Sequence, residues 1–454
     1  MQAKQTLKHA TCSGDLLGAN SDLLHYQQGA DKMTQDRAKI ATAVRNRVDT
    51  ATVVHNRTLH MLSEFDISPE RGFLPDPDPI VVLPHSEVFS PLEDMAGQLP
   101  KLLVAGALRK ELMDFSKQIL CQVAQHASGM VGQYARDSQI ARRLKVIFDY
   151  LGQAYVWGQD PPATSIPEGF AEFWFRVSDK LDLPPVLCYA PYALYNWRRL
   201  DPDKPIALGN IAIVQNFLGG MDEDWFVLIH VDIEHQARPI PGAIITALQA
   251  TASADADALL GSIATITASL ENMLETLNRM PEFCDPYIYY TRVRPYLHGW
   301  KDNPSLPNGL HYPAIGQYKF RGESGAQSAI VPSLVAALDI RHTESTFTPY
   351  LAEMLNYMPK EHRRFVRAIE HLAHNGHSIL DFVVARKDTN PELYASYRDC
   401  RHTLHAFRQK HFEYAGRYIH AQDQRHGANP HAIGTAGTPF MTSLKQLMDE
   451  TWFD

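Results

Sequence analysis

The stretch that most constrains the fold begins at Asn390 and keeps the helical period without interruption. Asn390 can cap a helix, Pro391 suits the first helical position, and Glu392 favours the positive end of the helix dipole. Apolar or aromatic side chains and one histidine then recur at spacings of 3, 4, 3, 4, 3 and 4 residues; they are Tyr397, Cys400, Leu404, Phe407, His411, Tyr414 and Tyr418. This pattern predicts a long helix that turns His411 towards the protein interior.

Most of the remaining chain also favours helices. Between residues 257 and 280 apolar side chains recur every three or four positions, which predicts a helix packed within a bundle. Helical patterning covers residues 91–158 and resumes after Pro185. The four prolines within residues 70–84 fix φ and exclude a helix there. Since no strand alternation is sustained and no β-α-β rhythm is visible, we expect an all-α protein.

Composition narrows the class of protein. The 454 residues carry a formal net charge of −8, which argues against a surface that neutralises phosphates, so we expect no nucleic-acid partner. No segment reaches the ~20 apolar residues that span a bilayer, and the N-terminus lacks a signal-peptide core. The five cysteines are scattered and form no Cys-x-x-Cys pair, which favours a reducing compartment. We expect a cytoplasmic monomer with no membrane partner. Its expected parts are an N-terminal extension over residues 1–64, a smaller helical domain over 65–180 and a large helical domain over 181–454.

His411 and Arg408 are the first candidates for a functional site. A histidine on an aromatic-lined helix is either a core residue satisfied by a hydrogen bond or an axial ligand to haem. Arg408 lies one turn earlier on nearly the same face. A cation beside an apolar pocket needs an anion, which a haem propionate or an ordinary carboxylate would supply equally well.

Other patterns are weaker. His371, His374 and His377 share a helix spacing, but no further ligand completes a metal site, and the pair His402 and His405 is typical of a helix surface. His230 lies in an apolar run, and Arg294 lies among aromatic residues where it could clamp a carboxylate or bridge to a helix end. The small-residue loops GESGAQS and GTAGT lack the Gly-Lys-Ser/Thr sequence of a phosphate loop.

Taken together and in order, nine short blocks resemble the indoleamine 2,3-dioxygenases. The blocks are FLPDPDP from Phe73, AYVWG from Ala154, LDLPPVL from Leu181, NW from Asn196, RPYLHGWKDNP from Arg294, SGAQS from Ser324, YMPKEHRRF from Tyr357, FRQKHFEYAGRYI from Phe407 and GTAGT from Gly434. The resemblance covers the chain from about residue 65 to the C-terminus.

The resemblance implies a haem b enzyme that inserts both atoms of O2 into the indole C2–C3 bond of tryptophan and gives N-formylkynurenine. It also implies an all-helical fold with the haem in the larger domain. By residue-to-residue matching, His411 is the proximal ligand of the haem iron, Arg408 pairs with a propionate, and Arg294 binds the substrate carboxylate. The matching further assigns substrate contacts to a distal aromatic wall and two loops; these are Tyr189, Phe226 and Tyr289, then Ser324 and Gly325, then Thr435.

Three positions depart from the vertebrate members of the family. His230 replaces a distal serine and is similar to the histidine that faces the indole N–H in tryptophan 2,3-dioxygenases. With Arg294 and Ser324 it completes the expected catalytic set. Tyr289 replaces a phenylalanine. The acidic residue that supports the propionate-pairing arginine aligns with Val335, and the nearest acid is Asp339. Two alternatives therefore stay open: a related oxygenase acting on a substituted tryptophan in secondary metabolism, and a haem protein that binds O2 without turnover.

Overall fold

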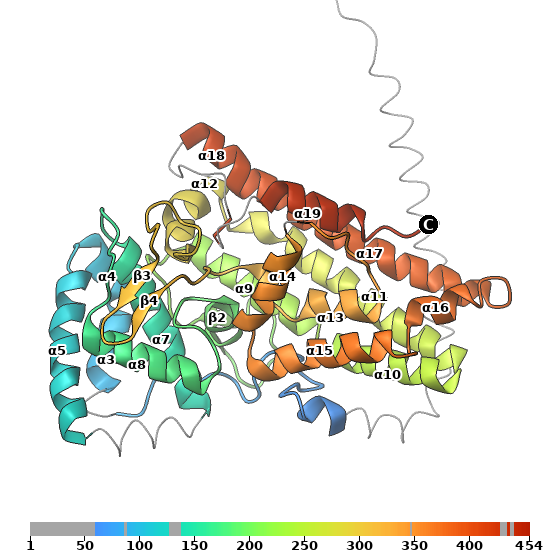
Figure 1. Ribbon diagram of the computed structural model, residues 1–454, viewed down its shortest axis with the longest axis horizontal. Coiled ribbons are helices and arrows are strands. Elements are labelled where there is room, and N and C mark those ends of the chain that lie inside the picture. Colours follow the sequence, from blue (N-terminus) through green and yellow to red (C-terminus); the bar gives the residue numbers. More distant parts are fainter. Residues whose placement is uncertain (1–59, 86–88, 127–137, 346, 427–433, 436–439) are drawn as a thin grey trace, which may run out of the picture. The chain divides into compact units, whose positions relative to one another are not determined.

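The helices of the chain form a layered arrangement around long, apolar central elements (Figure 1). The computed structural model describes residues 60–85, 89–126, 138–345, 347–426, 434–435 and 440–454. By their contacts, residues Val53–Asp454 form one compact unit. The predicted extension over residues 1–64 lies almost wholly outside the described residues. The predicted boundary at residue 180 stays a prediction.

Five helices form the first part of the described chain. They are α3 (Phe89–Gly97), α4 (Leu99–Val104), α5 (Leu108–His126), α7 (Ser138–Trp157) and α8 (Glu168–Lys180). Helices α5, α7 and α8 pack on one another (Figure 1). Helix α7 is buried on nearly all sides, and Trp174 Nε1 donates at 2.6 Å to Asp149 of its fully buried ion pair with Lys145. Such a pair lets a polar stretch lie inside the core.

The remaining helices of the described chain follow residue 220. They are α9 (Met221–Gln236), α10 (Ile240–Ser253), α11 (Ala256–Asn278), α12 (Pro286–Ile288), α13 (Ile330–Ala337), α14 (Thr348–Met354), α15 (Lys360–His374), α16 (Ile379–Val384), α17 (Pro391–Ala415), α18 (Ala421–His426) and α19 (Phe440–Asp449). Helix α11 packs against α9, α10 and α17, and α19 lies along α17 (Figure 1). The helix predicted over residues 257–280 is α11, capped by the Asp255 side chain, which accepts a hydrogen bond from the Ala258 N–H.

Short elements complete the architecture. Wide π-helical turns are η2 (Ala190–Leu194), η4 (Tyr289–Val293) and η8 (Gly416–His420); 3-10 turns are η3 (Met280–Glu282), η5 (Arg294–Leu297), η6 (Gly325–Gln327) and η7 (Leu355–Tyr357). Two antiparallel hairpins pair β1 (Trp197–Arg199) with β2 (Ile211–Ile213) and β3 (Leu310–Tyr312) with β4 (Gly316–Tyr318). The all-α prediction is confirmed, since the strands are three residues long and serve as connections. The expected absence of a helix within residues 70–84 is also confirmed.

Helix α17 forms where the stripe predicts it. The Asn390 side chain accepts a hydrogen bond from the Leu393 N–H at 3.1 Å, as a helix cap does. Along the stripe, burial changes. Tyr397, Cys400 and Leu404 are fully buried, whereas Phe407 is only partly buried and His411 is exposed. The helix therefore leaves the packed core one turn before His411.

Candidate active site

His411 is exposed to solvent and at the same time desolvated. Burial among protein atoms lowers the pKa of its imidazole to about 4, with the charges of His230 and Arg408 as further causes. An exposed side chain that is nevertheless surrounded by protein indicates an internal recess rather than an outer surface. Of the two alternatives for His411, a core residue satisfied by a hydrogen bond does not fit an exposed side chain. Because the imidazole is neutral at pH 7, it can act as a metal ligand.

Arg408 is a partly buried cation near this recess. Its Nη1 donates to the Leu447 carbonyl at 2.6 Å and to the Thr451 hydroxyl at 2.5 Å. Burial, and then the charge of Arg401, lowers the pKa of Arg408 to about 10. Within the part of the chain that the structure describes, no carboxylate pairs with it. The site thus keeps a desolvated positive charge one turn from His411.

The sequence left open what supports Arg408. Asp339, the nearest acid in the sequence, instead pairs with Arg341 at 3.0 Å. Support comes from the Leu447 carbonyl and the Thr451 hydroxyl, at the end of α19 and just beyond it. No local pattern relates residues 408 and 451, so sequence reasoning missed this contact. A neutral, accessible imidazole beside an arginine without a carboxylate partner is a donor set that fits haem iron and a propionate.

An aromatic wall forms from side chains far apart in the sequence. The Phe226 ring stacks on Tyr289 at 4.4 Å between centroids and lies 4.7 Å from the His230 ring. Tyr189 meets His230 edge-on at 6.0 Å, and Tyr192 lies 6.2 Å from Phe226. The structure thus brings the three predicted residues of this wall together with His230 and adds Tyr192. Two of them, Tyr189 and Tyr289, lie at the start of π-helical turns, which are frequent at functional sites.

The hydrogen bond of His230 fixes its tautomer. Nδ1 lies 2.7 Å from the Phe226 carbonyl oxygen, which can only accept, so Nδ1 carries the proton and donates. Nε2 is then left as an acceptor. Burial lowers the pKa of His230 below its ordinary value of 6.5, with the Phe226 bond opposing. His230 is therefore neutral at pH 7, with a lone pair available for a donor.

A buried carboxyl lies behind the wall. The Tyr189 hydroxyl and the Ser328 hydroxyl both donate to Glu234 Oε1, at 2.9 and 2.7 Å. Glu234 is 1% exposed, and burial raises its pKa to about 7. Sequence analysis missed Glu234, although its position four residues after His230 on a predicted helix places both side chains on one face. This pair of bonds holds the Tyr189 ring in place.

Arg294 begins the η5 turn and is 2% exposed. Its Nη1 lies 3.2 Å from His298 Nε2, and its guanidinium lies 5.6 Å from the Tyr290 ring centroid. Burial, together with the charge of Arg294, lowers the pKa of His298 well below 6.5, so His298 is neutral and accepts from the arginine. The spacing of four residues was visible in the sequence, but the role of His298 as the partner of Arg294 was not foreseen.

The two predicted loops meet near this turn. The Ser324 hydroxyl accepts from the Ala326 N–H and from the Tyr350 hydroxyl, both at 3.3 Å, while Gly325 is exposed. The Thr435 hydroxyl donates to the Glu323 carbonyl at 2.6 Å. The rest of the predicted GTAGT loop, residues 436–438, lies outside the described residues. Ser324 and Thr435 are therefore on adjoining segments.

The wall and the serine loop are joined by one amide. Gln327 Oε1 accepts from the Tyr189 N–H at 2.9 Å, and its Nε2 donates to the Gly322 carbonyl at 2.9 Å. The predicted residues thus form connected groups. His411 interacts electrostatically with Arg408 and His230, the wall surrounds His230, and the loops lie against η5.

The other histidine groups take no part in this arrangement. His371 and His374 are exposed on α15, and His371 accepts from Asn375. His402 stacks on Trp452 at 3.9 Å and bonds to the Phe453 carbonyl, so it is a packing residue rather than a plain surface residue. Among the residues that the structure describes, no group of three or more His, Cys, Asp or Glu side chains could hold a metal ion.

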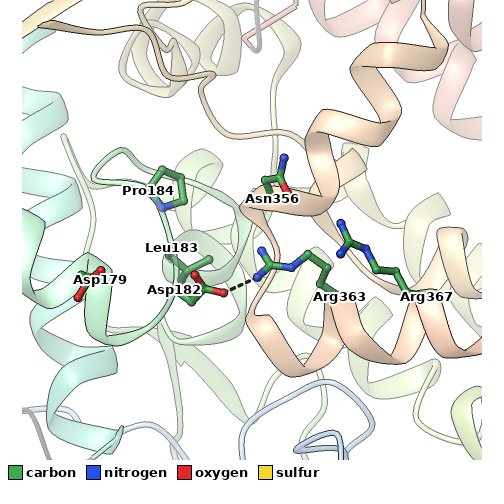
Figure 2. Close-up of a pocket in the computed structure, with 7 residues that line it drawn as sticks. All are labelled: Asp179, Asp182, Leu183, Pro184, Asn356, Arg363 and Arg367. Atoms are coloured by element: carbon green, nitrogen blue, oxygen red, sulfur yellow. Dashed lines mark hydrogen bonds and ion pairs between the residues drawn. The ribbon is translucent and has the colours of Figure 1, made fainter.

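A separate surface pocket of about 390 Å³ lies away from the predicted site (Figure 2). It is lined by Asp179, Asp182, Leu183, Pro184, Asn356, Arg363 and Arg367. Arg363 of α15 forms an ion pair with Asp182 across it. None of the predicted site residues lines this pocket, and the ion pair across it connects α15 to the end of α8.

Among the described helices, none is long and apolar enough to cross a membrane.

Known proteins match this chain along most of its length. The family model described as indoleamine 2,3-dioxygenase matches residues 61–453. Indoleamine 2,3-dioxygenase 1 of Rattus norvegicus is 32% identical over 406 residues, covering 86% of this chain and 95% of that protein. Indoleamine 2,3-dioxygenase of Saccharomyces cerevisiae is 29% identical over 439 residues, covering 87% and 94%. The 6-hydroxytryptophan 2,3-dioxygenase of Fusarium equiseti is 28% identical over 367 residues, covering 79% and 85%.

The extent of these matches agrees with the helical fold. The predictions of an enzyme and of a tryptophan-type dioxygenase are confirmed. The chain belongs to the indoleamine 2,3-dioxygenase family and is a dioxygenase, an oxidoreductase that acts on a small tryptophan-type substrate with O2.

Proposed function

We propose that this enzyme uses haem b, held by His411, to cleave the indole C2–C3 bond of L-tryptophan and form N-formylkynurenine. The observation that carries the proposal is the neutral, accessible His411, which interacts electrostatically with His230 of the aromatic wall. The reaction needs a ligand to the iron and a group that contacts the substrate, and both must line the same cavity. His411 would be the ligand, and His230 would contact the substrate. The enzyme works as a cytoplasmic monomer in this proposal.

Two residues of α17 hold the cofactor. His411 offers a neutral imidazole nitrogen to the iron, and Arg408 offers its desolvated cation to a propionate. When bound, the haem supplies the activation of O2. Thr451 and the Leu447 carbonyl keep the Arg408 guanidinium in position, so the propionate meets a cation that is already oriented.

The remaining residues bind and orient the substrate. Arg294 binds the carboxylate, and its bond to neutral His298 limits the directions that the guanidinium can take. Phe226, Tyr189 and Tyr289 enclose the indole and exclude water. This holds the ring in one orientation, which lowers the entropic part of the barrier.

His230 recognises the indole nitrogen in this scheme. Because Nδ1 donates to the Phe226 carbonyl, Nε2 is the acceptor that the indole N–H requires. Ser324 and Gly325 of one loop and Thr435 of the other cover the substrate from the side of η5. The bond from Thr435 to the Glu323 carbonyl lets the two loops act together.

The test is direct turnover. Reduced protein mixed with L-tryptophan and air is expected to give N-formylkynurenine, followed by its absorbance and by mass spectrometry. His411→Ala is expected to purify without haem, whereas His420→Ala, a change at an exposed histidine nine residues later, keeps it. Haem bound at full occupancy with no product would instead identify a carrier of O2. Full haem with an unchanged spectrum in His411→Ala would assign the ligand to another histidine.

A substituted tryptophan is the second candidate substrate. It is favoured by the relative from Fusarium equiseti that is named for 6-hydroxytryptophan, and by the Tyr289 hydroxyl that this wall adds. Comparing kcat/KM for tryptophan and 6-hydroxytryptophan decides between the two. A clear preference for the hydroxylated substrate that Tyr289→Phe removes would favour the second candidate.

A further inference from the structure

Glu323 is a buried carboxyl that neither the fold nor the proposed reaction accounts for. It is 5% exposed and lies in the connection between β4 and η6, directly before Ser324. No described residue forms a hydrogen bond or ion pair with its carboxyl group, and burial alone raises its pKa to about 8. A buried acid without a partner among the described residues is costly, and a cationic ligand would supply that partner.

The backbone places Glu323 against the turn that carries Arg294. The Glu323 N–H donates to the Leu297 carbonyl at 3.1 Å, and the Thr435 hydroxyl donates to the Glu323 carbonyl. The contact is tight, since a Cβ on Gly322 would lie 2.1 Å from the Leu297 carbonyl oxygen. Glu323 is therefore held at a fixed place beside η5.

The carboxyl group of Glu323 acts electrostatically on the aromatic wall. Its charge raises the pKa of the buried tyrosines on four surrounding elements; these are Tyr150 of α7, Tyr189 and Tyr192 at η2, Tyr289 of η4 and Tyr350 of α14. At the Tyr289 hydroxyl, Glu323 raises the pKa and Arg294 lowers it. Both charges thus act on one hydroxyl at the edge of the stacked pair formed by Tyr289 and Phe226.

We infer that Glu323 binds the α-ammonium group of an amino-acid substrate whose carboxylate is bound by Arg294. The inference rests on the proposed function for the carboxylate contact of Arg294. An α-amino acid carries its ammonium and its carboxylate on the same carbon atom, and Glu323 and Arg294 offer groups of opposite character beside one turn. Binding the zwitterion would give Glu323 a cation and Arg294 a carboxylate in one step, which a neutral ring hydroxyl would not do.

Three related ligands separate the two charges. L-Tryptophan has both, tryptamine has only the ammonium, and indole-3-propionate has only the carboxylate. Affinities are measured by calorimetry on the haem-loaded enzyme under nitrogen, where no turnover occurs. Glu323→Gln is expected to lower the affinity for tryptophan and tryptamine by roughly tenfold or more, because a charge-assisted hydrogen bond is lost. The affinity for indole-3-propionate should stay unchanged. Arg294→Ala is expected to lower the affinity for tryptophan and indole-3-propionate and to leave the affinity for tryptamine unchanged.

Proton release gives a second readout. Since Glu323 holds its proton near pH 7, binding an ammonium should ionise it and release up to about one proton. Titrations in two buffers of different ionisation enthalpy measure this number. Release with tryptophan and tryptamine, absent with indole-3-propionate and absent in Glu323→Gln, supports the inference. Glu344→Gln, at an exposed acid, is the matched control and should behave as the unchanged enzyme.

Each failure has its own signature. The ratio of the affinities for tryptophan and indole-3-propionate is compared between the unchanged enzyme and Glu323→Gln. The same ratio in both proteins would overturn the ammonium contact, even if N-formylkynurenine forms. A Glu323-dependent preference without any product would leave the contact standing and overturn the proposed function. Because the comparison is a ratio within one protein, Glu323→Asp, which retracts the carboxyl by one methylene, provides the same test if Glu323→Gln folds poorly.

Discussion

At the scale of single residues, the site depends on charged groups whose burial costs solvation free energy. Arg294 is the clearest case, since its guanidinium is 2% exposed and is oriented by a neutral histidine. Arg294→Ala should lower kcat/KM for tryptophan by about 10- to 150-fold, the loss of ~1.5–3 kcal/mol for a charge-assisted contact. Tryptamine, which has no carboxylate, should lose much less. Arg292→Ala, a change at an exposed arginine, is the control. Equal losses of kcat/KM for both substrates in Arg294→Ala would show that Arg294 has a structural role.

The pH dependence of turnover belongs to His230. A histidine of ordinary pKa would lose its acceptor nitrogen below about pH 6.5. Here burial lowers the pKa of His230, so the neutral acceptor persists as the pH falls through 6.5. The acidic limb of kcat/KM for tryptophan should therefore begin below pH 6.5, and His230→Ser should remove it while haem stays bound. The same acidic limb in both proteins would contradict a hydrogen bond from the indole to His230.

At the scale of elements, α17 carries the cofactor residues, and its start can be tested separately. Asn390→Ala removes the bond to the Leu393 N–H and should lower the free energy of unfolding by about 1 kcal/mol. Urea denaturation measures this loss, with Asn308→Ala at an exposed loop position as the control. A loss no greater than that of the control would mean that tertiary packing alone fixes the start of the helix.

The loop from Gly322 to Gly325 offers a matched pair of glycines. An added Cβ at Gly322 would meet backbone atoms of residues 297–299 at 2.1 to 2.8 Å, whereas at Gly325 it would meet nothing within 4 Å. Gly322→Ala should therefore displace the loop and reduce both stability and turnover, because backbone cannot move aside as a side chain can. Gly325→Ala should fold normally, so any rise in KM would place Gly325 beside the substrate. Thermal melts with substrate kinetics distinguish the two variants, and a normal Gly322→Ala enzyme would contradict the close approach.

Elements differ in how far the sequence could predict them. Helices α11 and α17 follow from a sustained period and a capping residue, both local features. The β1–β2 and β3–β4 hairpins have three-residue strands, too short for alternation to be visible. The site residues on motif blocks could be predicted from the family resemblance. Glu234, His298 and Thr451 could not, because their roles arise from contacts that only the folded chain creates.

At the scale of the whole molecule, buried titratable groups act in opposite directions. Burial lowers the pKa of His235 to about 4 and of His362 to about 3, so unfolding takes up protons below pH 6.5 and stability falls as the pH falls. Burial raises the pKa of Glu223 and Glu234 to about 7 and of Glu323 to about 8. Unfolding therefore releases protons above pH 4.5, and stability falls as the pH rises through these values.

The two sets oppose each other between pH 4.5 and 6.5. The free energy of unfolding should therefore be greatest in this mildly acidic range and should decline both towards pH 8 and below pH 4. Denaturant titrations at a series of pH values measure the profile. In Glu323→Gln, which removes one of the acids, the decline towards pH 8 should be smaller. A free energy of unfolding that rises steadily from pH 5 to pH 8 would contradict this account.

Side chains of α7 form hydrogen bonds with residues after position 181, so the chain cannot be cut between these parts without losing those bonds. Trp157 Nε1 and Gln153 Nε2 both donate to the carbonyl of His298, at 2.8 and 3.3 Å, and Lys145 donates to the Val186 carbonyl. His298, which orients Arg294, is thus held by side chains that lie 141 and 145 positions earlier in the sequence. A gene fragment starting at residue 181 would lack these donors. The two halves of the coding sequence should regain ligand binding only when produced together, as complementing pieces of one protein.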